Sequence, residues 1–284
     1  MTASGKTSAS IQLAKKINAQ IICADSRIVY KDLDIVSAKP TKEEQDGIIH
    51  HLIDIVSPNE DFSAGDFVNL AKEKIEEIFN QNQKVIICGG TWFYIKSLLD
   101  EKSLPECKIN HKLREELSKL SNQELWQKLF SLDEKRANEI HQNNKNKVIR
   151  SIEMCLELNQ PISEYQRKAN EIFPSKWYML DFEREELYQR INKRVDIMIN
   201  QGLIEEWENN RIKYPDSLIL RNTIGYKEFF ELEEGIYKDE KEAIEKVKQH
   251  TRNFAKRQIT YFNSNKNIKK IKNYTEILKD LNYD

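Results

Sequence analysis

Hydrophobic residues form two kinds of pattern in the first hundred positions. Continuous apolar runs at Ala19–Ala24 and Lys84–Cys88 are typical of buried strands. Between them, Ala64–Gln81 carries apolar side chains at helical spacing, which predicts a helix packed against a sheet. Strands that alternate with helices predict an α/β domain with a mostly parallel sheet. Two later runs, Trp177–Phe182 and Ile268–Ile271, are further strand candidates, the second at a sheet edge.

The rest of the chain has a helical pattern. Residues Lys112–Ser163 are rich in Glu, Lys, Leu, Asn and Gln and contain no convincing strand. Helical spacing resumes at Glu185–Arg211 and continues to Phe262. We therefore predict an α/β core formed by residues 1–104 and 176–284, which includes the C-terminal helices. A helical domain at residues 105–175 is inserted into this core.

Composition narrows the class of protein. The 284 residues are 39% hydrophobic and 32% charged, with a formal net charge of −1, so the chain can bury a core. No apolar run approaches the roughly 20 residues of a membrane helix. Met1–Thr7 lack the features of a secretory signal, so we expect a cytoplasmic protein without membrane contact. The four cysteines form no C-x-x-C pair, which disfavours a zinc knuckle or a disulfide framework.

Charge is concentrated near the C-terminus. His250–Lys272 contains seven Lys or Arg residues and no acid, with Phe254, Tyr261 and Phe262 among them. Such a run is either a solvated helix end or a contact for a polyanion, whose phosphates basic side chains neutralise.

A phosphate-binding loop is predicted at the N-terminus. Thr2–Thr7 (T-A-S-G-K-T) leads into a helical pattern and matches the second half of G-x-x-x-x-G-K-[ST]. In such a loop Lys6 neutralises the terminal phosphates, and the Thr7 hydroxyl holds Mg²⁺. The chain begins after the expected first loop glycine and preceding strand. The predicted fold class is therefore α/β, a P-loop NTPase-like parallel sheet core with an inserted helical domain and a helical C-terminal part; the alternative is a chance S-G-K-T.

Two other segments follow the predicted strands. Asp25 comes directly after the first strand, where its carboxylate could accept a proton, join a Mg²⁺ shell or only cap the next turn. Gly89-Gly90-Thr91 follows the second strand, where open α/β sheets bind their ligands, although a tight turn would look the same. His50 and His51 are adjacent rather than spaced for a metal, so we interpret them as structural.

A set of motifs in fixed order extends over nearly the whole chain. It resembles the tRNA dimethylallyltransferase family. The motifs are T-A-S-G-K-T at 2–7, A-D-S at 24–26, S-A-K-P at 37–40, H-H-L-I-D at 50–54, F-S-A-G-D-F at 62–67, G-G-T at 89–91, R-V-D-I-M-I-N-Q-G-L at 194–203, I-G-Y-K-E at 224–228 and T-R-N-F-A-K-R-Q-I-T-Y-F at 251–262.

The resemblance implies an activity and its partners. A dimethylallyl group would be transferred from dimethylallyl diphosphate to N6 of adenosine 37 in tRNAs that read codons starting with U. The phosphate loop would then hold diphosphate rather than ATP, with Mg²⁺ as the cofactor. The partners would be dimethylallyl diphosphate and the anticodon stem-loop of tRNA, and the protein would be a monomer.

The resemblance also implies roles for individual residues. Asp25 would act as the general base, Arg194 would neutralise the diphosphate, and Thr91 would lie where the flipped adenine meets the donor. The binding residues would be Thr2, Ala3, Ser4, Gly5, Lys6 and Thr7 for diphosphate, Thr7 for Mg²⁺, and Asp25, Ser26, Arg27, Ile28, Thr91, Asn146, Lys147, Val148, Ile149 and Arg150 for tRNA.

Four positions depart from the family's pattern. Ile28 replaces a polar residue, Asp32 a frequent glycine, Trp92 a small residue and Lys147 an arginine. None of them removes a residue assigned to chemistry. Other activities stay open on the sequence: isopentenyl transfer to free adenine nucleotides, a small-molecule P-loop kinase, or a non-catalytic RNA-binding relative of the enzyme.

Overall fold

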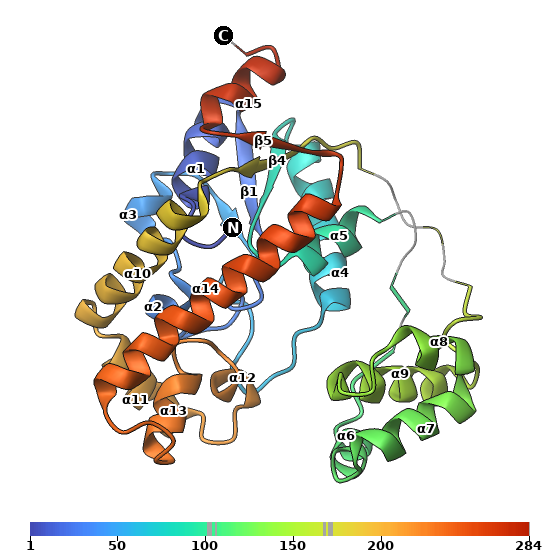
Figure 1. Cartoon of the computed structure of the whole chain (residues 1–284). Helices are drawn as coiled ribbons and strands as arrows, with labels where there is room; N and C mark the ends of the chain where they lie inside the picture. Colours follow the sequence, from blue (N-terminus) through green and yellow to red (C-terminus); the bar gives the residue numbers. More distant parts are fainter. Residues whose placement is uncertain (101–103, 106, 167–168, 170–172, 284) are drawn as a thin grey trace. The chain divides into compact units, whose positions relative to one another are not determined.

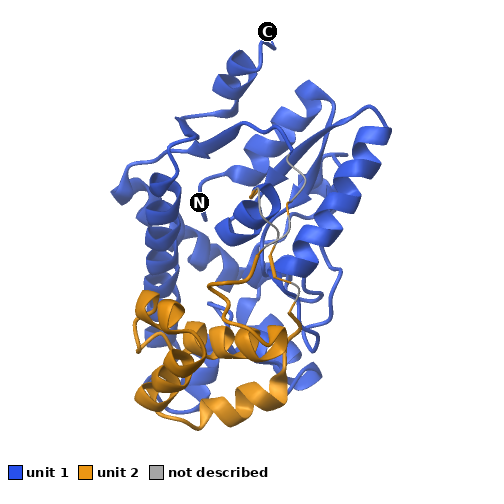
Figure 2. Cartoon of the chain, turned by 90° about the vertical axis from the view of Figure 1, so that its right-hand side faces the viewer, with its two compact units in different colours: residues 1–99, 172–284 blue, residues 100–171 orange. Residues whose placement is uncertain are grey.

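A computed structural model describes residues 1–100, 104–105, 107–166, 169 and 173–283. The chain divides into two compact units, a core unit of residues 1–99 and 172–284 and a helical unit of residues 100–171 (Figure 2). The core unit thus consists of two stretches of chain on either side of the helical unit in the sequence. The sequence prediction had placed these boundaries at 104/105 and 175/176.

Helices outnumber strands along the chain, and the strands are short (Figure 1). The elements are α1 (Lys6–Ile17), β1 (Ala19–Cys23), α2 (Asp34–Ser37), α3 (Lys42–Gln45), β2 (His50–His51), α4 (Ala64–Asn80), β3 (Lys84–Cys88), α5 (Trp92–Leu99), α6 (His111–Ser118), α7 (Asn122–Leu132), α8 (Glu134–Glu139), α9 (Lys145–Leu158), β4 (Trp177–Leu180), α10 (Arg184–Asn200), α11 (Leu203–Lys213), α12 (Leu218–Arg221), α13 (Lys227–Glu233), α14 (Glu240–Ser264), β5 (Ile268–Ile271) and α15 (Tyr274–Asp280).

A small parallel sheet organises the core unit. Its strand order is β2-β1-β3, and β1 pairs with β3 from Ala19↔Lys84 to Cys23↔Cys88. This confirms the parallel sheet and both strands predicted from apolar runs. His50 and His51 form β2. All five residues of β1, the central strand, are buried, because elements pack on both faces of the sheet.

Helices cover both faces of this sheet (Figure 1). Side chains alternate along a strand, so Ile21 and Cys23 face α1 while Ile22 faces α4. The apolar stripe predicted for α4 packs there, apart from Phe79, whose side chain is exposed. Ser63 caps α4 by accepting a hydrogen bond from the Asp66 N–H (3.2 Å), and the Ser63 N–H in turn donates to Asp66 Oδ2 (2.8 Å).

The C-terminal part of the core unit carries the remaining strands. Residues of the predicted strand Trp177–Phe182 form β4, which pairs in parallel with β5 as a separate two-stranded sheet. The helical stretch predicted over Glu185–Arg211 is two helices, because Gly202 adopts a left-handed conformation (φ 96°) between α10 and α11. The long helix α14 packs on α10 and α13.

The helical unit contains α6 to α9. Its core joins Leu117, Leu125, Leu129, Val148 and Ile152, each nearly or fully buried. A side chain caps the N-terminus of each of these four helices, and Ser121 with Glu124 forms a capping box at α7. Among the described residues of the whole chain, none of the helices combines the length and apolarity needed to cross a bilayer.

Candidate active site

The core unit contains a cavity of about 80 Å³ next to the carboxyl ends of β1 and β3. Open α/β sheets bind ligands at this edge. The cavity collects residues from both ends of the sequence. Its lining residues are Thr2, Lys6, Thr7, Ser10, Ile21, Cys23, Asp25, Ile28, Ser37, Ala38, Pro40, His50, Cys88, Gly89, Gly90, Arg194, Phe254 and Gln258.

The loop before α1 borders the cavity. Ala3 (φ 54°) and Gly5 (φ 78°) are both left-handed, and Gly5 occupies the N-cap position of α1 without a side-chain cap. The first N–H groups of a helix lack intrahelical partners, so this end can bind an anion. Lys6 and Thr7 follow in the first turn and line the cavity, as does Thr2. Ala3, Ser4 and Gly5 are not among the lining residues.

Lys6 points back at its own loop. Its Nζ donates to the Met1 carbonyl (2.8 Å), which also accepts from the Ser4 hydroxyl (2.8 Å). Removal of the ammonium from water lowers the pKa of Lys6, nearby Arg194 lowers it further, and Cys88 and Asp25 oppose the shift. An anion in the cavity would therefore stabilise the charged form of Lys6.

Asp25 follows β1 and faces the same cavity. Its Oδ1 accepts a hydrogen bond from the Arg27 N–H (3.0 Å), so Asp25 also caps the turn after the strand. Capping of the turn is thus compatible with a role of Asp25 in the cavity. Ser26 and Arg27 are not among the lining residues, whereas Ile28 is.

The glycine pair after β3 has a steric role. A Cβ on Gly89 would lie 1.9 Å from the Ala24 carbonyl oxygen, and a Cβ on Gly90 would lie 2.6 Å from Gln258 Nε2. At Gly89, only glycine permits this close approach of the two strand ends. Thr91 does not line the cavity; its Oγ1 accepts from the Ser26 N–H (2.9 Å), which fixes the residue after Asp25. Its catalytic role stays a prediction.

Two C-terminal helices close the cavity. Arg194 comes from α10, and burial lowers the pKa of its guanidinium, with Asp25 and Glu44 acting against that shift. Phe254, an aromatic residue of the basic run near the C-terminus, faces the cavity from α14. Gln258, one helical turn later, is 3% exposed and was missed by the sequence analysis. The Thr2 N–H donates to Gln258 Oε1 (2.7 Å), and Gln258 Nε2 donates to the Gly90 carbonyl (2.8 Å).

The second predicted tRNA segment lies in the helical unit, at the start of α9. Asn146 and Lys147 are exposed. Val148 and Ile149 belong to the core of this unit, so their side chains are not available to RNA. Arg150 is already engaged: its guanidinium donates to the Cys107 carbonyl (3.0 Å) and pairs with a carboxylate of the same helix. Any RNA contact here therefore depends mainly on Asn146 and Lys147.

Two of the unusual positions have a local explanation. Asp32 adopts φ 62°, the left-handed conformation that glycine favours, and its carboxylate accepts a hydrogen bond from Lys213 Nζ (2.7 Å). Trp92 packs edge-to-face on Trp177 and Phe262, with ring centroids 5.4 Å apart in each case.

Comparison with known proteins identifies the family. A family model described as IPP transferase matches residues 28–265. The chain belongs to the IPP transferase family. It is 43% identical over 276 residues to a tRNA dimethylallyltransferase of Clostridioides difficile, which covers 94% of this chain and 88% of that protein. A tRNA dimethylallyltransferase of Alkaliphilus oremlandii is 42% identical over 274 residues, covering 94% and 87% of the two chains.

Solved structures agree with this membership of the IPP transferase family. The full-length tRNA isopentenylpyrophosphate transferase of Bacillus halodurans aligns with a TM-score of 0.72 at 35% identity, over 99% of this chain and 93% of that one. A eukaryotic dimethylallyltransferase, captured in crystallographic snapshots acting on tRNA, aligns with a TM-score of 0.77 at 28% identity. That alignment covers 92% of this chain and 68% of the eukaryotic chain.

The donor atoms of the cavity suit a magnesium ion held jointly with a diphosphate. The Thr7 and Ser37 hydroxyls and the Asp25 carboxylate offer hard oxygen ligands. In the described part of the chain, no cluster of three or more His, Cys, Asp or Glu side chains is arranged to hold a metal by itself. Magnesium usually keeps few protein ligands and completes its shell with substrate phosphates and water, so this sparse set fits.

Proposed function

We propose that this chain transfers a dimethylallyl group from dimethylallyl diphosphate to N6 of an adenosine in tRNA. The observation that carries the proposal is the single cavity that collects two cationic side chains, a helix N-terminus and one carboxylate. The cationic side chains and the helix N-terminus can stabilise a diphosphate leaving group, and the carboxylate can accept the proton of a nucleophilic amine. The names of the relatives support the same chemistry.

The proposed reaction uses these groups as follows. Lys6 and Arg194 neutralise the negative charge that develops on the diphosphate as the C–O bond of the donor breaks. Thr7, together with the first N–H groups of α1, orients the diphosphate, and bound Mg²⁺ would add further positive charge there. The adenosine N6 lone pair forms the new C–N bond. Asp25 accepts the proton that N6 loses, and diphosphate departs.

Finer aspects of the proposal concern the fold and the RNA. The N-terminal loop and parallel sheet support a P-loop-like core that binds diphosphate rather than ATP. The expected target is adenosine 37 beside the anticodon in tRNAs that read codons starting with U, because a loop nucleotide leaves its stack more easily than one in a duplex. Asn146 and Lys147 in the helical unit, and the exposed Lys256 and Arg257 on α14, are the proposed tRNA contacts.

Mass spectrometry of tRNA nucleosides tests the proposal. The purified protein is incubated with unmodified tRNA, dimethylallyl diphosphate and Mg²⁺, and a parallel reaction offers AMP as the acceptor. We expect N6-dimethylallyladenosine from tRNA only. Product from AMP alone would favour a nucleotide isopentenyltransferase, and product from neither acceptor would favour a non-catalytic RNA-binding protein.

The role of Asp25 has its own test. Asp25→Ala is expected to lower the rate of transfer at least about a hundredfold, as loss of a general base does, while tRNA still binds. Rates come from single-turnover assays and tRNA binding from filter retention. Asp61→Ala, which changes a carboxylate outside the cavity lining, is the matched control. Transfer at the wild-type rate in Asp25→Ala would remove Asp25 from the chemistry.

A further inference from the structure

One wall of the cavity is formed by a segment with little support of its own. Ser37, Ala38 and Pro40 line the cavity, and they follow or end the four-residue helix α2. The N-cap residue of α2, Leu33, makes no side-chain cap hydrogen bond. A helix of one turn is costly to form, and its first N–H groups have no intrahelical partner. Another part of the chain must therefore hold this wall.

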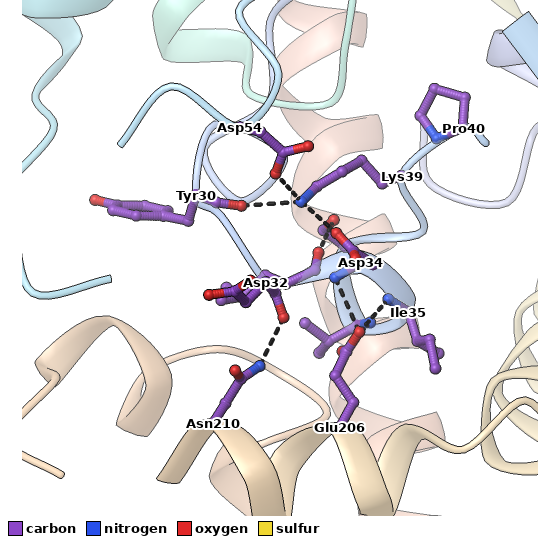
Figure 3. Close-up of polar contacts among 12 residues, drawn as sticks. Tyr30, Asp32, Asp34, Ile35, Lys39, Pro40, Asp54, Glu206 and Asn210 are labelled. Atoms are coloured by element: carbon purple, nitrogen blue, oxygen red, sulfur yellow. Dashed lines mark hydrogen bonds and ion pairs between the residues drawn. The ribbon is translucent and has the colours of Figure 1, made fainter. Parts of the chain in front are cut away.

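Glu206 of α11 supplies that support. Its Oε2 accepts hydrogen bonds from the N–H groups of Asp34 (2.9 Å) and Ile35 (2.6 Å), and its Oε1 accepts one from Val36 (3.0 Å). Figure 3 shows the carboxylate reaching from α11 to the start of α2. A negative charge at a helix N-terminus is favourable, and hydrogen bonds to a charged acceptor are stronger than neutral ones. One side chain thus caps the whole first turn of α2.

Glu206 is itself held in place by buried groups. The Tyr226 hydroxyl donates to Glu206 Oε1 (2.7 Å), and Asn210 Nδ2 donates to the Tyr226 oxygen (2.9 Å) and to the Asp32 carbonyl (2.6 Å). Burial, together with the neighbouring Glu206, raises the pKa of Tyr226, so its hydroxyl keeps the proton that it donates. The tyrosine of the I-G-Y-K-E motif therefore has a definite partner.

The glycine of the same motif contributes by being small. Gly225 has φ 102°, and a Cβ there would lie 2.8 Å from a methyl group of Val36. The Gly225-Tyr226 pair thus packs against α2 and also orients the residue that caps it.

Lys39 fixes the other end of the wall. Its side chain is 6% exposed and lies between two residues of the cavity lining in the sequence. Nζ donates to the Tyr30 carbonyl (3.0 Å), to Asp34 Oδ1 (2.6 Å) and to Asp54 (Figure 3). These three acceptors match the three N–H donors of an ammonium group. The wall is therefore anchored at its start by Glu206 and at its end by Lys39.

We infer that Glu206 is a positioning residue for the prenyl diphosphate: it sets the wall Ser37–Pro40 from outside the cavity. Glu206 is not among the residues that line the cavity, so it would act only through α2. This inference rests on the proposed function, which makes the cavity the donor site. In a cavity of about 80 Å³, a small displacement of one wall changes how the donor fits.

Variants of Glu206 test the inference. Glu206→Ala removes all three hydrogen bonds to α2, whereas Glu206→Gln keeps one carbonyl oxygen as an acceptor. We expect the KM for dimethylallyl diphosphate to rise about tenfold in Glu206→Ala and less in Glu206→Gln, while the KM for tRNA stays within about twofold. Glu208→Gln, an exposed position on the same helix, is the matched control and should change neither value.

Two further measurements separate positioning from stability. Hydrogen exchange of the peptide that contains Asp34–Val36 should accelerate in Glu206→Ala, because those N–H groups lose their acceptor. Calorimetric titration of inorganic diphosphate with Mg²⁺ should show the same order of affinity, wild type above Glu206→Gln above Glu206→Ala. Tyr226→Phe removes the hydrogen bond from Tyr226 to Glu206 and the one from Asn210 to the Tyr226 oxygen, but leaves the Glu206 carboxylate in place. It should give the same changes to a smaller degree if Glu206→Ala does not fold.

The outcomes are distinct. A folded Glu206→Ala protein with wild-type donor KM and diphosphate affinity would overturn the inference, as would equal rises in the KM of both substrates. If the wild-type protein transfers no prenyl group, the proposed function fails. Diphosphate titration and hydrogen exchange then still decide whether Glu206 positions the cavity wall.

Discussion

The Gln258 side chain links three parts of the cavity, and its loss has a calculable cost. In Gln258→Leu, a side chain of similar size keeps the packing of α14 but loses the bonds to the Thr2 N–H (2.7 Å) and the Gly90 carbonyl (2.8 Å). The Gly90 oxygen keeps a second donor, the Trp92 N–H at 3.2 Å, so it is not left unpaired. Two neutral hydrogen bonds at about 1 kcal/mol each give a loss of about 2 kcal/mol.

This free energy predicts a measurable change in melting temperature. For a unit of this size, 1 kcal/mol corresponds to about 2–4 °C, so Gln258→Leu should melt about 4–8 °C below the wild type. The Thr2 loop would also lose its tie to α14, so the affinity for inorganic diphosphate with Mg²⁺ should fall about tenfold, which is 1.4 kcal/mol. Differential scanning fluorimetry and calorimetric titration measure the two effects.

The matched control is Gln249→Leu, an exposed glutamine on the same helix, which should leave diphosphate affinity unchanged. If Gln258→Leu melts with the wild type and binds diphosphate equally well, the two hydrogen bonds do not hold the loop and the reasoning is wrong. A lower melting temperature with unchanged affinity would show that the loop finds its binding conformation without α14.

Two other predictions concern charge. Burial lowers the pKa of Lys6, so the free enzyme loses this positive charge at a lower pH than an ordinary lysine does. As pH rises through this lowered pKa, kcat/KM for the donor should therefore fall. Lys6→Arg, which stays charged, should not show this fall, and an identical fall in both proteins would assign it to another group. Lys147→Ala should weaken tRNA binding and reduce the slope of log K against log salt by about 1, unlike Lys135→Ala on the same unit. Unchanged salt dependence would place Lys147 outside the interface.

Local patterns predicted the elements of the core well. The apolar runs of β1 and β3 and the helical spacing of α4 arise because these elements bury one face or both in the core. The sequence shows such burial as a periodic pattern of apolar residues. Phe79 shows the limit, because its place on the apolar stripe does not decide whether another element covers it. The break at Gly202 was missed because the apolar residues before and after it both have helical spacing.

The parts of the site that the sequence did not predict depend on distant partners. Gln258 reads as one polar residue in a basic helix, and Glu206 as an ordinary surface charge. Their roles follow from hydrogen bonds to Thr2 and to Asp34, which lie 256 and 172 positions away along the chain. Neither the composition nor the spacing of residues predicts hydrogen bonds between positions so far apart in the sequence. Sequence motifs nevertheless placed Lys6, Asp25 and Arg194 in one site, and the structure brings all three to one cavity.

The bond between Thr2 and Gln258 also bears on the order of events during synthesis. A chain leaves the ribosome from its N-terminus, so the N-terminal loop that contains Thr2 emerges long before α14, which carries Gln258. The helical unit, whose contacts are local, can form in the meantime. Capacity to hold diphosphate would then appear only after α14 has been made, so nascent chains that lack α14 should not compete with finished enzyme for the prenyl donor.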